Sequence, residues 1–168
     1  PGIFVQDEMK LGKHTLLLGA RYDYNSRHGS IFTPRMAYKY KFNQTDVVRL
    51  NIGRGFRIVN LFTEDHAALT GSRDVIIKEA LNPEQSWNAN INYVKKIVTG
   101  SSFVGLDASV FSTHFTNRIL PDYETNPNQI IYDNLDGYAV SKGVSLNLDF
   151  NFPFPLKVIA GGTYMENF

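Results

Sequence analysis

Apolar side chains recur at every second residue over stretches of ten residues or more, and this alternation limits the possible folds of the 168-residue chain. Helical periodicity is nearly absent, whereas a period of two is that of a β-strand. Strands of globular proteins average about five or six residues, while about nine to eleven residues cross a membrane as a tilted strand. The sequence therefore predicts an all-β chain of long strands. One clear alternating set is Leu16, Leu18, Ala20, Tyr22 and Tyr24.

We expect eight strands, joined in an antiparallel up-and-down meander. They span approximately residues 2–9, 15–25, 31–42, 46–56, 86–97, 102–115, 138–152 and 156–168.

The connections between these strands alternate in length. In a meander, alternate connections lie at the same end of the sheet, so every short turn is predicted at one end and every long loop at the other. A soluble sandwich has no reason to sort its loops in this way, whereas an outer-membrane barrel combines short periplasmic turns with long extracellular loops. The tight connections are 10–14, 43–45, 98–101 and 153–155, and the longer ones are 25–30, 57–85 and 115–137.

Composition excludes several classes of protein. The chain has 17 basic and 16 acidic residues, so bulk charge indicates no nucleic-acid partner. Cysteine is absent, which excludes a disulfide scaffold, thiol catalysis and cysteine-ligated zinc. The 12 Phe, 9 Tyr and 13 Gly fit either a barrel wall or a soluble β protein. The chain begins Pro-Gly without an initiator Met, and we expect a processed or excised segment.

Two interpretations of the meander remain open on these residues alone. Aromatic residues gather near both predicted ends of the strands, as in the two girdles of a membrane barrel. The alternative is a soluble β-sandwich with one buried face. We favour the barrel wall. The aromatics are Tyr22, Tyr24, Phe56 and Trp87 at one rim, and Tyr38, Tyr40, Phe42, Phe150 and Phe152 at the other.

The stretch from Arg49 to Tyr93 resembles the barrel of TonB-dependent outer-membrane receptors. It reads RLNIGRGFRIVNLF, then a loop, then NPEQSWNANINY. The segments GARYDYN, TPRMAYKYKF, FSTHFTNRI and GYAVSKGVSLNLDF are also similar to the family, in the family's order. Ile58-Val59 replaces the family's common Ala-Pro. The matching residues are Gly53, Gly55, Phe56, Arg57, Asn60, Leu61, Asn82, Pro83, Glu84, Ser86 and Trp87.

The resemblance implies that residues 1–168 are part of a transmembrane barrel of about 22 strands, without its plug domain and TonB box. The implied function is uptake across the outer membrane of a Gram-negative bacterium, energised by TonB. The implied cargo is a scarce nutrient bound as a small molecule or metal chelate: an iron siderophore, cobalamin or haem. The implied partners are outer-membrane lipid, the plug, the rest of the barrel and the TonB complex. A soluble β-sandwich binding or adhesin module and a passive porin remain the alternatives.

The loop between residues 57 and 85 holds the candidate ligand-binding residues, because receptor loops carry ligand contacts. His66 occupies a place comparable to a loop histidine of haem receptors, although we favour a solvated loop histidine. Arg73 and Lys78 are candidates for an anionic ligand, against the simpler interpretation of loop salt bridges. We favour a structural role for Arg57 and Glu84, as anchors of the two loop ends. The ligand candidates are Glu64, Asp65, His66, Arg73 and Lys78.

The sequence predicts no enzyme, no resident cofactor and no metal site. No Gly-x-Ser-x-Gly motif occurs, and no pair of the four histidines has metal-binding spacing. The polar faces of the strands are too costly to bury in lipid, so they are predicted to face the lumen, where they contact either the plug or water. The lumen-facing set is Arg21, Asp23, Arg35, Lys39, Lys41, Arg49, Asn88, Asn90, Asn92, Asp107, Asn147, Asp149 and Asn151.

Overall fold

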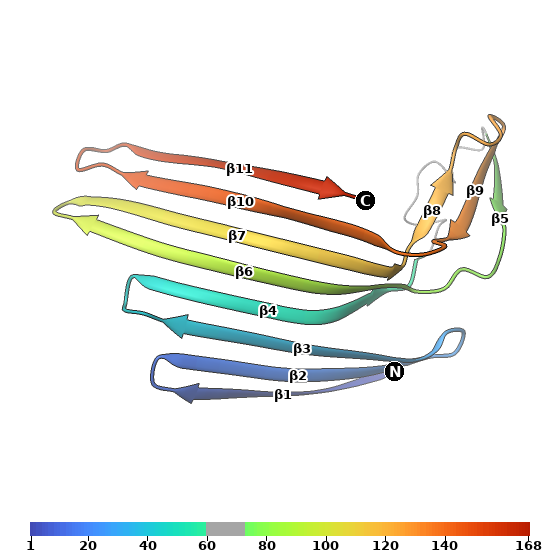
Figure 1. Ribbon diagram of the computed structural model, residues 1–168, viewed down its shortest axis with the longest axis horizontal. Helices are drawn as coiled ribbons and strands as arrows, with labels where there is room; N and C mark the ends of the chain where they lie inside the picture. Colours follow the sequence, from blue (N-terminus) through green and yellow to red (C-terminus); the bar gives the residue numbers. More distant parts are fainter. Residues whose placement is uncertain (60–72) are drawn as a thin grey trace.

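The computed structural model describes residues 1–59 and 73–168, and its regular structure consists of eleven β-strands in two sheets. The larger one, which we call the wall sheet, is an antiparallel meander in which each strand pairs with its neighbour (Figure 1). Its eight strands confirm the predicted number and positions to within a few residues. They are β1 (Gly2–Leu11), β2 (His14–Asn25), β3 (Gly29–Lys41), β4 (Asp46–Arg57), β6 (Glu84–Thr99), β7 (Ser102–Asn117), β10 (Ala139–Asn151) and β11 (Lys157–Asn167).

The connections of the wall sheet are sorted by length as predicted. The tight turns β1–β2, β3–β4, β6–β7 and β10–β11 lie together at one end, which we call the short-turn end, and the longer connections lie at the other (Figure 1). Turn chemistry explains how the chain reverses there. Gly12 and Gly100 both adopt φ of 59°, a left-handed conformation that favours glycine. Asn43 Oδ1 accepts hydrogen bonds from the amides of Thr45 and Asp46, both at 2.8 Å.

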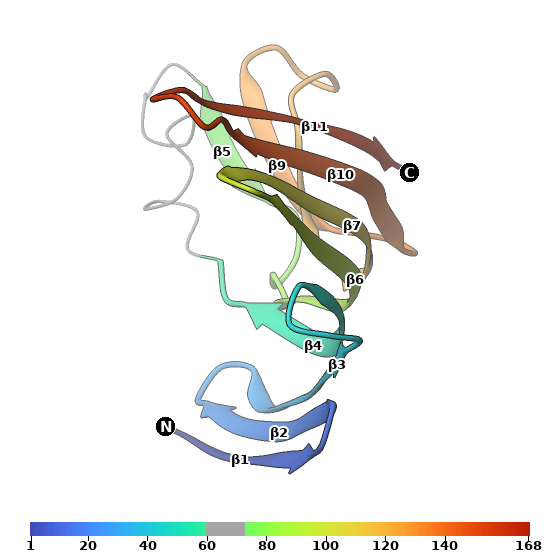
Figure 2. The ribbon, with the colours of Figure 1, turned by 90° about the vertical axis from the view of Figure 1, so that its left-hand side faces the viewer.

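Cross-strand register gives the wall sheet two chemically different faces. Residues paired across strands share a face. Leu18 pairs with Met36, Met36 with Ile52, and Ile52 with Ala89, forming an apolar row. On the other face, Gly53 pairs with both Arg35 and Asn88. The wall sheet also curves from β1 at one edge to β11 at the other (Figure 2).

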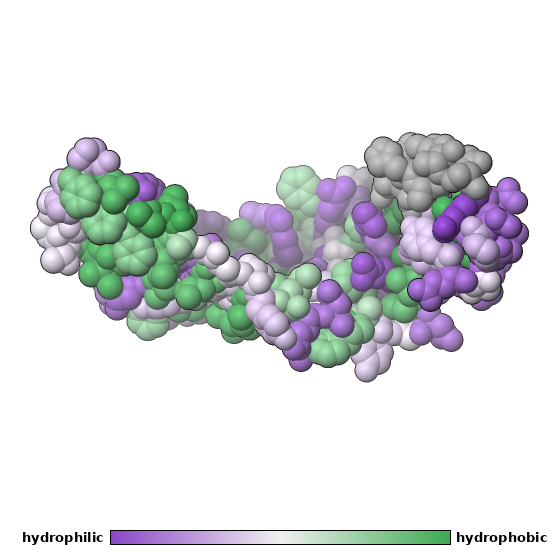
Figure 3. All heavy atoms as spheres, turned by 90° about the horizontal axis from the view of Figure 1, so that it is seen from above, coloured by the Kyte–Doolittle hydropathy of each residue, from purple (hydrophilic) through white to green (hydrophobic). Residues whose placement is uncertain are grey.

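The wall sheet has almost no buried core. Ile31 is its one buried hydrophobic residue among those described. Ile91, in the middle of the apolar face, keeps 53% of its surface exposed. Hydrophobic residues also gather at the short-turn end (Figure 3, left), where Val98 is 67% and Phe154 55% exposed. Apolar surface this extensive indicates a lipid environment. No helix among the described residues is long and apolar enough to cross a membrane.

The second sheet, which we call the loop sheet, lies at the long-loop end (Figure 1). Sequence analysis expected residues 57–85 and 115–137 as loops, and this was wrong for three short segments. β5 and β9 pair in parallel, and β8 pairs antiparallel with β9. The three strands are β5 (Asp74–Ile77), β8 (Ile119–Asp122) and β9 (Gln129–Asn134).

A small hydrophobic core stabilises the loop sheet. Ile119, Ile130 and Tyr132 are at most 8% exposed, and Val59, Val75 and Leu81 pack against them. All six residues come from the two long connections of the wall sheet rather than from its eight strands. The described parts of the two long loops therefore pack together as one unit at the long-loop end of the wall sheet.

Candidate functional site

The joint between the loop sheet and the wall sheet is built around Glu84, the first residue of β6. Glu84 Oε2 accepts hydrogen bonds from Arg57, with Nε at 2.9 Å and Nη2 at 2.8 Å. Its Oε1 accepts the amide of Ile119 at 3.1 Å, at the start of β8. The Glu84 side chain is 12% exposed. One carboxylate thus contacts the end of β4 and the start of the second long loop.

Two asparagines complete the joint. The Asn117 side chain donates to the carbonyls of Asn82 at 3.2 Å and Pro83 at 3.1 Å. The Asn134 side chain donates to the carbonyl of Ala80 at 3.0 Å, while its Oδ1 accepts the Asn82 amide at 2.9 Å. Sequence analysis placed Asn82 and Pro83 in a family motif but missed Asn117 and Asn134. No local signal marks them, because the partners of their side chains are 17 to 55 residues away in the chain.

The polar edge of the loop sheet is held by an ion pair. Lys78 Nζ lies 2.6 Å from Asp133 Oδ2. This hydrogen bond and its attraction raise the pKa of Lys78 and lower the pKa of Asp133. Hydrogen bonds from the hydroxyl and amide of Thr125, and from the amide of Glu124, lower the pKa of Asp122. Lys78, Asp133 and Asp122 are therefore all charged at neutral pH.

The predicted ligand residues are only partly within the described structure. Glu64, Asp65 and His66 lie outside the described residues, as do the motif residues Asn60 and Leu61.

Two of the ligand candidates are described. Arg73 is exposed immediately before β5, and Lys78 follows β5 and pairs with Asp133. Lys78 thus forms a loop salt bridge, the simpler of its two interpretations.

The remaining motif residues belong to β4 and β6, the two wall strands whose ends meet at the joint. Gly53, Gly55, Phe56 and Arg57 belong to β4, and Trp87 belongs to β6 opposite Arg54.

A pocket of about 380 Å³ lies at the joint. It contains the Arg57–Glu84 pair and a second guanidinium, that of Arg118, 5.2 Å from the centre of the Phe115 ring. Arg118 makes no ion pair with any described residue. A cation beside an aromatic ring at the long-loop end of the wall sheet can bind an anionic or aromatic ligand. The pocket is lined by Gly55, Phe56, Arg57, Glu84, Gln85, Ser86, Phe115 and Arg118.

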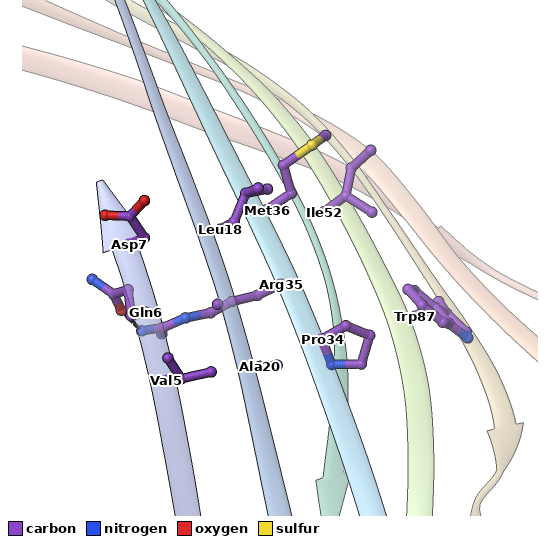
Figure 4. Close-up of a pocket in the computed structure, with 11 residues that line it drawn as sticks. Val5, Gln6, Asp7, Leu18, Ala20, Pro34, Arg35, Met36, Ile52 and Trp87 are labelled. Atoms are coloured by element: carbon purple, nitrogen blue, oxygen red, sulfur yellow. Dashed lines mark hydrogen bonds between the residues drawn. The ribbon is translucent and has the colours of Figure 1, made fainter. Parts of the chain in front are cut away.

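A larger hollow of about 500 Å³ lies on the wall sheet itself (Figure 4). Most of its lining is apolar, including Leu18, Met36 and Ile52 of the apolar row. It fits a hydrocarbon chain better than a polar solute. Within residues 1–59 and 73–168, no group of three or more His, Asp or Glu side chains is placed to hold a metal ion.

The long strands, the sorted turns and the apolar outer face define the wall of an outer-membrane β-barrel. The chain belongs to the TonB dependent receptor-like, beta-barrel family, whose model matches residues 1–167. The resemblance found in the sequence is thereby confirmed, and the sandwich interpretation is set aside. The chain is an outer-membrane component of a Gram-negative bacterium and is not an enzyme.

Individual relatives agree with this assignment. The chain is 30% identical over 114 residues to an iron-regulated outer membrane virulence protein of Vibrio cholerae, covering 66% of this chain and 17% of that protein. Its fold matches the siderophore receptor PirA from Pseudomonas aeruginosa with a TM-score of 0.76 and 22% identity, over 99% of this chain and 31% of PirA. It also matches the FrpB iron transporter from Neisseria meningitidis with a TM-score of 0.72 and 16% identity, over 99% of this chain and 25% of FrpB. The chain thus spans less than a third of each of these relatives.

Proposed function

We propose that residues 1–168 form part of the barrel domain of a longer receptor that imports a scarce nutrient with energy from TonB. The proposed cargo is an iron siderophore, cobalamin or haem. The observation that carries the proposal is the family match over residues 1–167, since this family consists of such receptors. The names of the relatives, an iron-regulated protein and a siderophore receptor, favour iron among the three.

The structure supports different roles for the two faces of the wall sheet and for the loop sheet. The apolar face of the wall sheet contacts outer-membrane lipid, and the polar face borders the lumen that holds the plug. Arg73 is exposed before β5, Lys78 follows β5 in an ion pair with Asp133, and the joint pocket adds Arg118. In the proposed cycle, these loop groups capture the ligand, and TonB then rearranges the plug. No resident cofactor is required.

Uptake assays in a strain lacking the gene test this function. Complementation with the complete gene should restore uptake of one labelled cargo among ferric siderophores, cobalamin and haem, and deletion of TonB should abolish it. Uptake that persists without TonB would show a passive porin instead. For haem specifically, His66→Ala should weaken binding, and unchanged binding would remove His66 from the site.

A further inference from the structure

The apolar face of the wall sheet carries two cations near its long-loop end. Arg54 lies three residues before the end of β4, and Lys142 lies three residues after the start of β10. Register places both on the apolar face, because Arg54 pairs with Trp87 and Lys142 lies in the row of Ala89. Lys95, the other lysine or arginine on this face of the described strands, lies at the short-turn end. Long cationic side chains near a strand end extend to the membrane surface, where anionic headgroups attract them.

Arg54 is half-buried and bonds to a neutral group, because its Nη2 donates to the side-chain oxygen of Gln85. It makes no ion pair with any described residue. A guanidinium has five N–H donors in a planar fork that matches a phosphate group. Arg54 therefore keeps donors for an anion that approaches from the membrane.

Lys142 has an acidic neighbour at longer range. Its Nζ lies 3.7 Å from Glu166 Oε2, beyond hydrogen-bond distance, and 4.6 Å from the centre of the Phe168 ring. The other carboxylate oxygen of Glu166 accepts the hydroxyl of Tyr164 at 2.7 Å. Because an ammonium has three donors, Lys142 can bind a further anion.

A hollow in the apolar face lies beside Arg54. It is the hollow of about 500 Å³, which is lined by Trp87, the partner of Arg54, and by Pro34 and Met36 (Figure 4). It opens where the pairing of β3 with β4 stops short of Pro34 and Arg54. The one carboxylate of its lining, Asp7, lies on β1, three strands away from β4.

A second hollow, of about 420 Å³, lies beside Lys142, which forms part of its lining. Ala89 and Ser112 pair across β6 and β7 in this lining, and their small side chains leave the space open. Ile91 and Val110 add apolar surface. Each cation near the long-loop end therefore stands beside an apolar hollow.

Charge at the membrane surface decides which lipid such hollows select. Within hydrocarbon, an acyl chain gains contact energy from the shape of a hollow and little from the hydrophobic effect. Arg54 and Lys142 are three strands apart, about 14 Å, and are offset by two residues along the strands. Two anionic groups on one headgroup can reach both cations, whereas a single phosphate reaches one of them.

We propose that the long-loop end of the apolar face binds a glycolipid that carries two phosphate groups and several acyl chains. One phosphate binds Arg54, the other binds Lys142, and acyl chains occupy the two hollows. Glycolipid of this chemistry forms the leaflet on the long-loop side of an outer membrane. The site lies on the face opposite the lumen, so it does not depend on which cargo the receptor imports.

Native mass spectrometry of the complete, delipidated receptor in a non-ionic detergent tests the site. Diphosphoryl lipid A should bind in a one-to-one complex, and monophosphoryl lipid A should bind about fivefold more weakly, because one cation loses its anion. Phosphatidylglycerol should bind more weakly still, and pyrophosphate should not bind. Equal affinity for the three lipids would show an unselective lipid surface, and binding of pyrophosphate would show a site for a free anion. Either result would overturn the proposal.

Substitution of the two cations tests the headgroup contacts. Arg54→Gln and Lys142→Gln should each weaken the binding of diphosphoryl lipid A about fivefold, whereas Arg54→Lys should retain most of the affinity. Lys95→Gln is the matched control at the short-turn end and should have no effect. Unchanged affinity in both glutamine variants would contradict the assignment, as would receptor dimers that form in place of the lipid complex.

Filling one hollow tests the acyl-chain contacts separately. Ala89→Phe should occupy the second hollow and weaken the binding of lipid A, while the yield of folded receptor stays unchanged because the ring faces lipid. Ala160→Phe is the control, since Ala160 pairs with Leu148 on the same face and lines neither hollow. Equal affinity in the two variants would exclude the hollow as a chain site. Lipid binding is measured without transport, so its failure and the failure of uptake are distinguishable.

Discussion

The two sheets of this chain keep their apolar side chains away from water in opposite ways. The wall sheet has eight strands and one buried hydrophobic residue among those described, whereas the loop sheet has three short strands and buries three. The difference follows from the surroundings of each sheet. Lipid replaces a core for the wall sheet, because hydrocarbon solvates one face and the lumen the other. The loop sheet projects into water and needs a core of its own.

Truncating a core side chain of the loop sheet should have the largest effect among these tests of the comparison. Tyr132→Ala removes a side chain that is 2% exposed, and aromatic-to-alanine changes in cores cost about 3–5 kcal/mol. Hydrogen exchange at the amides of β9 should accelerate strongly, while exchange in β6 and β7 stays slow. Leu120→Ala, at a residue 41% exposed, is the control and should have little effect. Equal acceleration in both sheets would mean that they fold as one unit.

A charge on the lipid-facing side tests the other half of the comparison. Ile91→Arg should destabilise the receptor in lipid vesicles by about 2–4 kcal/mol, the cost of arginine near the bilayer midplane of a barrel. Asn90→Arg is the matched control, since Asn90 lies one residue away on the polar face. Denaturant unfolding in vesicles measures both. If Asn90→Arg is as damaging as Ile91→Arg, the two faces have been assigned wrongly.

The joint connects the two sheets, and its amides should matter less than the core. Asn134→Ala leaves the Asn82 amide without its acceptor, at a cost of about 1–3 kcal/mol. The expected result is faster proteolytic cleavage within residues 118–138 of the intact receptor. Asn128→Ala, at an exposed position of the same loop, provides the comparison. Identical cleavage rates in the two variants would show that the joint does not hold the loop.

Acid should weaken the loop sheet slightly. Asp133 has a pKa below its ordinary value of 3.8, because Lys78 donates to it. The stabilising effect of such a carboxylate is fully present above that ordinary value and is lost as pH falls through the lowered pKa. Exchange in β9 should therefore be constant from neutral pH to about pH 5 and accelerate below pH 4, after correction for intrinsic rates. Asp133→Asn should reduce this additional acceleration to the part contributed by Asp122, whose pKa is also lowered, and a wild-type loop sheet with no acceleration would exclude the ion pair as a stabilising contact.

Sequence predicted the wall sheet well and the loop sheet poorly, for a physical reason. A strand between lipid and water shows its environment in its own alternation, as residues 16–24 do. The strands β5 and β8 have four residues each, too few for a period to emerge, and β5 pairs with β9 more than 50 residues away.

The residues of the joint also differ in how well the sequence predicted them. Arg57 and Glu84 were found through motifs at the two loop ends, whereas Asn134 depends on contacts that exist only after the loops associate.

The self-contained core of the loop sheet has an evolutionary consequence. Because Ile119, Ile130 and Tyr132 all come from the connections, substitutions among them leave the hydrogen-bond register of the wall strands untouched. Selection can then reshape the surface exposed to the environment while the barrel beneath it stays the same, in the way that antibody loops diversify on a constant framework. Descendants of this chain should therefore differ far more in their loop sheets than in the eight strands that carry them.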